Sequence, residues 1–304
     1  MNYPQVSVII LNHNGLDDTL ECLESLKKVT YPNRKVVVVD NGSKGNDVEI
    51  LRQTSGHDVH LVENDRNWGF AEGNNIGIRY ALTVFDPAYL LLLNNDTVVA
   101  PDLLNELVAV AESQPDIGIV SPKIYWYDFR GRSDVVWYAG GRIRWWHPAV
   151  YRIVGRHSDD LPQYQGVATT DWASGAAMMI KRTVLGELSL LNSRYFFGNE
   201  DIEYCLKARK RGFRTAYVPT AMVWHKMGAS RNRRAITPKV LLNHVDNHYR
   251  FISGNFSALV WAYHVLLLPV FLLHSFWFCL LDRKRRHTLP GLSLVSGKDS
   301  LPSQ

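Results

Sequence analysis

Polar and acidic side chains stand where a long apolar run ends, which marks a candidate site for chemistry. The stretch YLLLLNNDTVV, from Tyr89 to Val99, places Asn94, Asn95 and Asp96 directly after four leucines. An apolar run of this length predicts a strand buried on both faces, as in the middle of a parallel sheet. Ligands bind outside the carboxyl ends of such strands, so Asp96 could hold a hard cation and a phosphate. The alternative is an ordinary turn, since Asn and Asp are common turn residues.

Two earlier apolar runs end in the same way. Val6 to Leu11 is followed by Asn12, and Lys35 to Val39 is followed by Asp40. A third, shorter run covers Val59 to Val62, and segments with apolar residues at helical spacing separate the runs. This alternation predicts an α/β fold with a mostly parallel sheet and crossover helices.

A glycine-rich loop, Asn64 to Leu82, precedes the leucine-rich strand and runs into a helix. Its glycines, Gly69 among them, would let the backbone approach a ligand at the start of that helix. The loop is not the dinucleotide-binding fingerprint, because its glycine spacing differs and it does not follow the first strand.

The second half of the chain contains a pair of acids and a histidine near predicted elements. Glu200 and Asp201 open a helix that extends to Gly212 and closes with basic residues, which favours both ends of the helix dipole. A strand from Phe213 to Val218 follows, and His225 lies just beyond it. Acids at a helix start and a lone histidine are both common structural features, so these residues carry little weight without a wider pattern.

Charge and cysteine usage narrow the class of protein. The formal net charge is +5, and much of the excess lies in Arg231 to Arg234 and Asp282 to His287. Such localised charge favours anionic lipid or phosphate over a general nucleic-acid surface. The three cysteines are far apart and form neither a disulfide framework nor a zinc spacing, which fits a reducing compartment. The first strand begins almost at once without a basic leader, so we expect no signal peptide.

The C-terminal segment differs from the rest of the chain. From Ala258 to Leu281 it contains no Asp, Glu, Lys or Arg, and its length suffices to span a bilayer. Basic clusters on both sides and Pro269 in the middle favour an in-plane or re-entrant helical hairpin over a simple span. The alternative is a helix pair buried against the catalytic domain or a second subunit. We therefore expect a catalytic domain at residues 1–235 and membrane-associated or oligomerisation helices with a tail at 236–304.

Seven segments resemble, in order, the family 2 glycosyltransferases, and most closely their rhamnosyltransferase-like branch. They are VSVIILNHNG, VVVVDNGS, NWGFAEGNNIG, LLLLNNDTVV, DWASGAAMMIKR, FFGNEDIEYCLKARKRGFRTAYVP and VWHKMGAS. The resemblance covers roughly residues 5 to 230 and implies a GT-A fold, an α/β Rossmann-like sheet that is mostly parallel and flanked by helices, here followed by a C-terminal hydrophobic helical segment. It also implies a nucleotide-diphosphate sugar donor, Mg²⁺ or Mn²⁺, and inversion at the anomeric carbon.

The resemblance also assigns roles to single residues. Asp201, with Glu200 before it, matches the catalytic base, whereas Asp96 and His225 match the metal ligands. The positions on the nucleotide side are Asn12, Asp40, which would recognise the base or ribose, Asn67, Gly69, Asn74, Asn75 and Asn95.

Two positions depart from the branch. Its Asp-X-Asp element reads Asn94, Asn95, Asp96 here and keeps one carboxylate, so Asn94 and Asn95 would be neutral supporters. The site would therefore depend on His225 and the diphosphate more than a full Asp-X-Asp site does. In addition, Asn192 stands where an Asp usually precedes the Phe-Phe pair, which would alter the acceptor loop.

These features predict an inverting, metal-dependent glycosyltransferase at the cytoplasmic face of the plasma (inner) membrane. It would extend a lipid-linked or cell-envelope glycan, with a polyprenyl-linked acceptor, a possible homo-oligomer and no nucleic-acid partner. A donor such as dTDP-rhamnose is implied by the branch alone. One alternative is a non-catalytic nucleotide-sugar-binding or assembly subunit, against which the retained Asp96, Asp201 and His225 argue. Another is a nucleotidyltransferase, but the loop from Asn12 to Gly15 contains no Lys or Arg.

Overall fold

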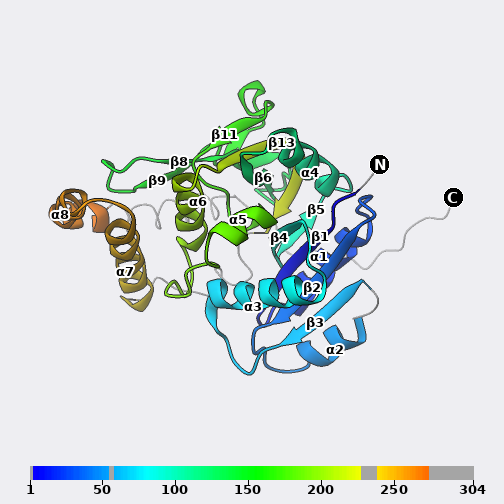
Figure 1. The fold of residues 1–304 in the computed structure, drawn as a ribbon. Helices are drawn as coiled ribbons and strands as arrows, with labels where there is room; N and C mark the ends of the chain where they lie inside the picture. The colour runs from blue at the N-terminus through cyan, green and yellow to red at the C-terminus, as the bar shows by residue number, and fades with distance from the viewer. Residues whose placement is uncertain (1–2, 55–57, 227–237, 274–304) are drawn as a thin grey trace.

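A mixed sheet of eleven strands runs through the part of the protein that the structure describes, with helices packed against it (Figure 1). The computed structural model describes residues 3–54, 58–226 and 238–273. The first part alternates strands and helices: β1 (Val6–Asn12), α1 (Leu16–Lys27), β2 (Arg34–Asp40), α2 (Asp47–Thr54), β3 (Val59–Glu63), α3 (Gly69–Val84), β4 (Tyr89–Asn94), β5 (Thr97–Val99) and α4 (Leu103–Ser113).

The centre of the sheet is parallel. Strand β1 lies between β2 and β4, and Ile9 pairs with Val37 on one side and Leu92 on the other. Strand β3 extends the parallel set beyond β2. The four leucines of β4 are buried, as a strand covered on both faces requires. The prediction of a mostly parallel sheet, with its strands ending at one edge, is therefore confirmed.

The second part of the chain makes the sheet mixed. It comprises β6 (Ile117–Trp126), β7 (Val135–Tyr138), β8 (Gly141–Ile143), β9 (Tyr151–Ile153), β10 (Ser158–Asp159), the 3₁₀ turn η1 (Pro162–Tyr164), β11 (Ala168–Thr170), β12 (Ala177–Lys181), α5 (Arg182–Glu187), α6 (Glu200–Lys210) and β13 (Arg214–His225). Strand β12 lies antiparallel between β4 and β6, and β13 runs parallel to β6. Strands β8 and β9 form a separate hairpin.

Two predicted strands differ from the observed ones. The stretch from Tyr89 to Val99 is two strands, because the chain turns at Asn95 and Asp96 and β5 leaves the path of β4 to pair antiparallel with β13. The strand predicted to end at Val218 continues to His225. Both differences arise from the same long-range pairing, in which Thr97 of β5 lies opposite His225 of β13.

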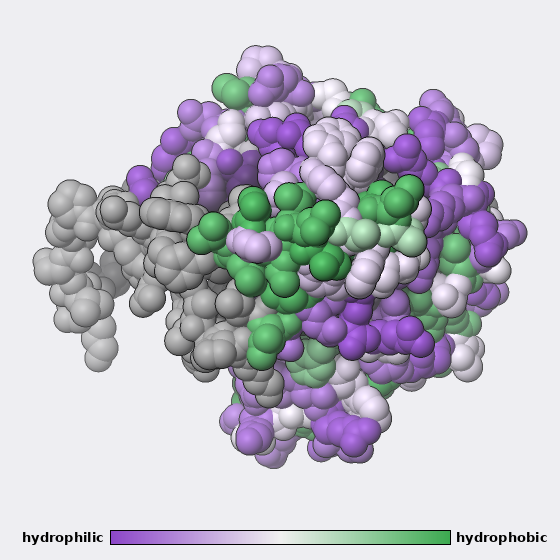
Figure 2. All heavy atoms as spheres, turned by 90° about the vertical axis from the view of Figure 1, so that its left-hand side faces the viewer, coloured by the Kyte–Doolittle hydropathy of each residue, from purple (hydrophilic) through white to green (hydrophobic). Residues whose placement is uncertain are grey.

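The C-terminal part forms two helices, α7 (Pro238–Asn255) and α8 (Ala258–Leu266), at one end of the molecule (Figure 1). Helix α7 packs against α6, where Lys210 Nζ donates to the carbonyl of Asn255 at 3.1 Å. Within the described ranges, no helix combines the length and apolar character needed to cross a membrane. The side of the molecule that carries α8 shows a gathered patch of apolar side chains (Figure 2). The predicted domain boundary at 235 and residues 274–304 lie outside the described residues.

Candidate active site

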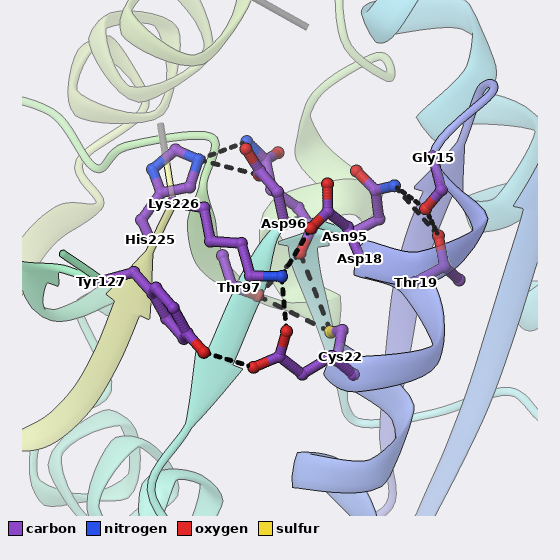
Figure 3. A network of polar contacts seen from close by, with 12 residues as sticks. Gly15, Asp18, Thr19, Cys22, Asn95, Asp96, Thr97, Tyr127, His225 and Lys226 are labelled. Carbon is purple, nitrogen blue, oxygen red and sulfur yellow. Dashed lines mark hydrogen bonds and ion pairs between the residues drawn. The ribbon is translucent and has the colours of Figure 1, made fainter. Parts of the chain in front are cut away.

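The pairing of β5 with β13 brings Asp96 and His225 together at the carboxyl edge of the sheet (Figure 3). Asp96 Oδ1 lies 2.9 Å from His225 Nε2, and the Asn94 side-chain nitrogen lies 3.4 Å from the same ring nitrogen. The His225 side chain is 7% exposed and that of Asp96 is 13% exposed, so water screens the pair weakly. The two residues predicted to hold a metal thus lie in direct contact.

The geometry of this pair fits a shared divalent cation. An octahedral ion with ligands about 2.1 Å away holds neighbouring ligand atoms about 3.0 Å apart, close to the spacing of Asp96 Oδ1 and His225 Nε2. If Nε2 accepts a hydrogen bond from the Asn94 amide, two acceptors face each other, which a cation would relieve. Among the described residues, no group of three or more His, Cys, Asp or Glu could hold a metal. Further ligands would therefore come from the bound diphosphate, as is usual for Mg²⁺.

Asn95 ties the turn before β5 to the start of α1. Its side-chain nitrogen donates to the Gly15 carbonyl at 3.2 Å and to the Thr19 hydroxyl at 3.0 Å (Figure 3). Thr19 in turn donates to the Asn12 side-chain oxygen at 2.9 Å. The predicted neutral supporter therefore joins the loop that carries Asp96 to the first strand-to-helix turn.

Lys226 forms a second connection between β13 and α1. Its ammonium group contacts the carboxylates of Asp18 and Glu21, and Glu21 accepts the Tyr127 hydroxyl at 2.7 Å (Figure 3). Burial lowers the pKa of Lys226, but the hydrogen bonds that its ammonium group donates to the two carboxylates outweigh this effect and leave the pKa raised. The Lys226 backbone N–H also donates to the Asp96 carbonyl at 2.9 Å. Lys226 was not predicted as a site residue from the sequence, although it directly follows His225, which was predicted.

The structure places Asn12 and Asp40 beneath the loops at this edge, where neither is exposed to solvent. Asn12 donates to Asp40 Oδ1 at 2.8 Å, and Asp40 Oδ2 accepts the backbone N–H of Ser43 at 2.9 Å. Asn12 also contacts Asp47 Oδ2 at 3.2 Å. In this structure both residues hold the loops after β1 and β2 in place. Contact with a nucleotide stays a prediction for them.

Asn41 lies at the centre of an amide network that the sequence did not reveal. Its side-chain nitrogen donates to Asn67 Oδ1 at 3.1 Å and to the Gly69 carbonyl at 3.0 Å. Its oxygen accepts hydrogen bonds from the Asn64 side chain and from the Trp68 backbone. Asn67 therefore belongs to a turn fixed by side-chain amides at the start of α3.

Gly69 is needed for a close approach within the protein itself. Its φ is +81°, and a Cβ there would lie 2.6 Å from the Phe196 carbonyl oxygen. That carbonyl accepts the backbone N–H of Phe70 at 2.7 Å. The start of α3 thus presses against the loop that precedes α6. An approach of Gly69 to a ligand stays a prediction.

Asn74 and Asn75 face inward from α3 and are nearly inaccessible to solvent. Asn74 donates to the Phe70 carbonyl at 2.9 Å. Asn75 donates to the Leu191 carbonyl at 2.8 Å and accepts the Leu191 N–H at 3.0 Å. Their observed contacts anchor α3 and the loop before α6, and nucleotide contact stays a prediction for both.

The predicted acid pair stands at the first turn of α6, and its two members have different surroundings. Asp201 is half-buried and accepts backbone N–H groups from Gly175 and Ile202, each at 2.8 Å. Glu200 is 4% exposed, and its Oε2 meets no hydrogen-bond partner among the described residues. Burial and the nearby Asp201 charge raise the pKa of Glu200 to about 8. Burial also raises the pKa of Asp201, against the opposing effect of the Gly175 N–H.

A short turn before β12 connects the acid pair, Glu200 and Asp201, with the turn that carries Asp96. Gly175 donates to Asp201, and the carbonyl of the next residue, Ala176, accepts the backbone N–H of Asn94 at 3.0 Å. The structure therefore brings Asp201 and the turn that carries Asp96 to the same edge of the sheet, through the Gly175 N–H and the Ala176 carbonyl. The predicted grouping of base and metal ligands is consistent with this arrangement.

Helix α7 holds the turn that leads into the acid pair. Asn247 donates to the Phe197 carbonyl at 2.9 Å and to the Gly198 carbonyl at 3.3 Å, and its own carbonyl accepts the Asn199 side chain at 3.3 Å. Gly198 and Asn199 both have positive φ angles, +97° and +77°. A turn of this kind needs fixed partners to persist. The C-terminal segment thus contributes to the site, which its composition did not predict.

The departure at Asn192 has a structural reason. Its side-chain nitrogen donates to Glu203 Oε2 at 2.9 Å, and its oxygen accepts the backbone N–H of Arg194 at 3.2 Å. Glu203 is nearly buried and also pairs with Lys207. An aspartate at position 192 would put two carboxylates in contact, so the amide suits this loop.

The mixed sheet with a parallel centre and flanking helices is the arrangement expected of a GT-A fold. Residues 4–243 match the family described as glycosyltransferase like family 2. The chain belongs to this family.

Relatives extend over most of the chain. It is 27% identical over 255 residues to the low-salt glycan biosynthesis hexosyltransferase Agl10 of Haloferax volcanii, with 82% of this chain and 75% of that protein covered. It is 25% identical over 224 residues to the poly-beta-1,6-N-acetyl-D-glucosamine synthase of Staphylococcus epidermidis, covering 72% of this chain and 49% of the relative. The chain thus spans about half the length of the second relative.

Two solved structures share the fold. One is the mannosyltransferase PcManGT of Pyrobaculum calidifontis in complex with GDP-Man and Mn²⁺, with a TM-score of 0.61 and 20% identity, covering 95% of this chain and 78% of that one. The other is GalNAc-T7 with UDP, GalNAc and Mn²⁺, with a TM-score of 0.63 and 21% identity, covering 81% of this chain and 48% of that one. At these identities the likeness supports the GT-A fold.

Proposed function

We propose that this protein is an inverting, metal-dependent glycosyltransferase that moves a sugar from a nucleotide-diphosphate donor to a hydroxyl group of a glycan acceptor. The observation that carries the proposal is the contact of Asp96 with His225 at the sheet edge to which Asp201 is also tied. The family membership supports it.

Asp96 and His225 would hold a Mg²⁺ or Mn²⁺ ion. When bound, that ion would neutralise charge on the diphosphate leaving group. Two structures of the same fold contain Mn²⁺, which makes Mn²⁺ the first ion to test.

Asp201 would take the proton of the acceptor hydroxyl as that oxygen attacks the anomeric carbon from the face opposite the diphosphate. Its two backbone N–H partners favour the ionised form and hold the carboxylate in one orientation. A general base typically contributes on the order of 10²- to 10⁴-fold to the rate. The neutral Glu200 beside it would add no second negative charge to the site at pH 7.

The acceptor we propose is a lipid-linked or cell-envelope glycan, such as a polyprenyl-linked sugar, handled at the cytoplasmic face of the plasma (inner) membrane. Exposed aromatic rings beside the acid pair support an acceptor of this kind, because they offer it a contact surface. Phe196 and Phe197 are 51% and 52% exposed. Phe70 packs edge-on against Phe197 with ring centres 6.1 Å apart. Aromatic rings of this kind offer apolar faces to a sugar or an isoprenoid chain.

The experiment that tests this function is a donor screen with Mn²⁺ and a polyprenyl-diphosphate sugar acceptor in detergent. We include dTDP-rhamnose because of the motif resemblance, and GDP-mannose, UDP-N-acetylglucosamine and UDP-N-acetylgalactosamine as chemically distinct donors. We expect transfer from one donor in the wild type and loss of at least 10²-fold in Asp201→Asn, with donor binding retained.

The alternative is a non-catalytic subunit that binds a nucleotide sugar. Donor binding without transfer or hydrolysis across the whole screen would favour that alternative. An Asp201→Asn variant with wild-type transfer would refute the assignment of the base.

A further inference from the structure

Apart from His264 and the Tyr263 hydroxyl, helix α8 consists of apolar side chains, and it is largely exposed. Leu259 is 83% exposed and Leu266 is 80% exposed, and the helical residues that follow expose Val270 and Leu273 by 48% and 60%. A patch of apolar side chains gathers on the side of the molecule on which α8 lies (Figure 2). A helix that is apolar all round is normally covered by protein or by lipid.

The polar groups of α8 are turned toward the protein. His264 is 1% exposed, and its Nε2 lies 2.6 Å from the Trp145 carbonyl and its Nδ1 3.2 Å from His248 Nε2. Tyr263 donates its hydroxyl to the Trp146 carbonyl at 3.0 Å. The outward side of α8 is therefore left to apolar atoms, as contact with a hydrocarbon phase requires.

The loop that receives these contacts carries exposed aromatics. Trp145 and Trp146 are 48% and 55% exposed, and Trp261 of α8 is 43% exposed. The loop is the tip of the β8–β9 hairpin, on the same side of the molecule as α8 (Figure 1). Tryptophan is enriched at the boundary between lipid and water, where its ring meets both phases.

The hairpin also contains an unusual charge pair. Arg142 and Arg152 lie directly opposite each other across β8 and β9, and both are exposed. Like charges in this position destabilise a strand pair. From residue 135 to residue 157 the sequence contains no Asp or Glu. An anionic partner would therefore stabilise the hairpin.

We propose that α8, the Trp145–Trp146 loop and the Arg142–Arg152 pair form one surface that seats in the plane of an anionic bilayer. The sequence supports lipid as the occupant, because residues 251–281 contain no Asp, Glu, Lys or Arg and Arg283 to Arg286 then supply four positive charges. Apolar insertion joined to basic residues is the pattern of interfacial helices. This inference rests on the proposed action at a membrane face, and it adds the surface of the protein that binds the membrane and the class of lipid that it binds.

The test is co-sedimentation of the full chain with vesicles of phosphatidylcholine alone or with phosphatidylglycerol, without donor or acceptor. We expect the wild type to bind the anionic vesicles and Leu259→Ser/Leu266→Ser to bind at least roughly tenfold more weakly. Arg142→Gln/Arg152→Gln should lose roughly tenfold on anionic vesicles and little on neutral ones. Val84→Ser, at an exposed position on α3, is the matched control and should bind as the wild type does.

Three outcomes would overturn the proposal. A wild type that does not bind vesicles would do so, whatever its transfer activity. Unchanged binding by the double serine variant, with melting temperature equal to the wild type, would assign vesicle binding to another surface. A wild-type dimer in sedimentation velocity that becomes a monomer in the serine variant, without vesicle binding by either, would assign the surface to a second copy. Because no sugar is transferred in this assay, its failure is distinct from a failure of the proposed activity.

Discussion

Replacing Glu200 by glutamine should stabilise the protein at alkaline pH and remove part of its pH dependence. The side chain is nearly buried, and its pKa is raised from 4.5 to about 8 by burial and by the adjacent Asp201 carboxylate. The native protein therefore keeps a proton on Glu200 between these two pH values, whereas the unfolded chain has released it. Glutamine has the same shape as the protonated acid and does not ionise.

The direction of this pH effect follows from the number of protons that the native and unfolded states bind. Where the native state binds one proton more than the unfolded state, stability falls as pH rises, by about 1.4 kcal/mol per pH unit. Across the interval from 4.5 to about 8 the loss amounts to roughly 5 kcal/mol, and it levels off above pH 8. Glu200→Gln should escape this loss, so its advantage over the wild type should grow from pH 5 to pH 8.

Urea unfolding followed by tryptophan fluorescence at pH 5, 7 and 9 would measure the effect. Glu49→Gln on the exposed face of α2 is the control, because that carboxylate is exposed and its variant should keep the wild-type slope. Parallel loss of stability in the wild type and in Glu200→Gln between pH 5 and pH 8 would refute the reasoning. It would mean that Glu200 is already ionised in the folded protein.

Three further changes test other parts of the site. Asp96→Ala should weaken nucleotide-diphosphate binding by tenfold or more with Mn²⁺ present and change it little in EDTA, as calorimetry would show; equal binding with the metal would count against the ligand role. Asn192→Asp should lower stability by about 1–3 kcal/mol at pH 7 and less at pH 4, because it faces the Glu203 carboxylate until one of the two is protonated. Asn247→Ala should lower kcat more than it raises donor KM, and a change in melting temperature alone would indicate a purely structural role.

The central strands and the acids at their ends could be predicted because both depend on local sequence. A run of apolar residues that ends in Asn or Asp marks a strand and its edge without any knowledge of the partner strands. The contact of Asp96 with His225 has no such signal, since it joins two residues that are far apart in sequence. It arises from the antiparallel pairing of β5 and β13, and the resemblance, not the spacing, indicated it.

Three residues of the site were not predicted from the sequence, for a different reason. Asn41, Lys226 and Asn247 look like ordinary surface or turn residues, because their types are common in loops and exposed helices. Each acquires its role from partners contributed by other segments: the turn before α3, the acids of α1 and the turn before α6. The sequence predicts an appended segment that includes Asn247, yet the hydrogen bonds of this residue join the segment to the turn before α6.

The Asp-X-Asp element keeps one acid in this chain, and its middle residue, Asn95, has a structural role of its own. Asn95 donates to the Gly15 carbonyl and to Thr19, and an aspartate could not donate to that carbonyl. The Asn95 amide therefore links the turn that carries Asp96 to the start of α1. Lys226 fixes the other side of the same turn, because its ammonium group pairs with Asp18 and its backbone N–H donates to the Asp96 carbonyl. A site with one carboxylate depends on the position of that carboxylate, and these two ties hold it against His225.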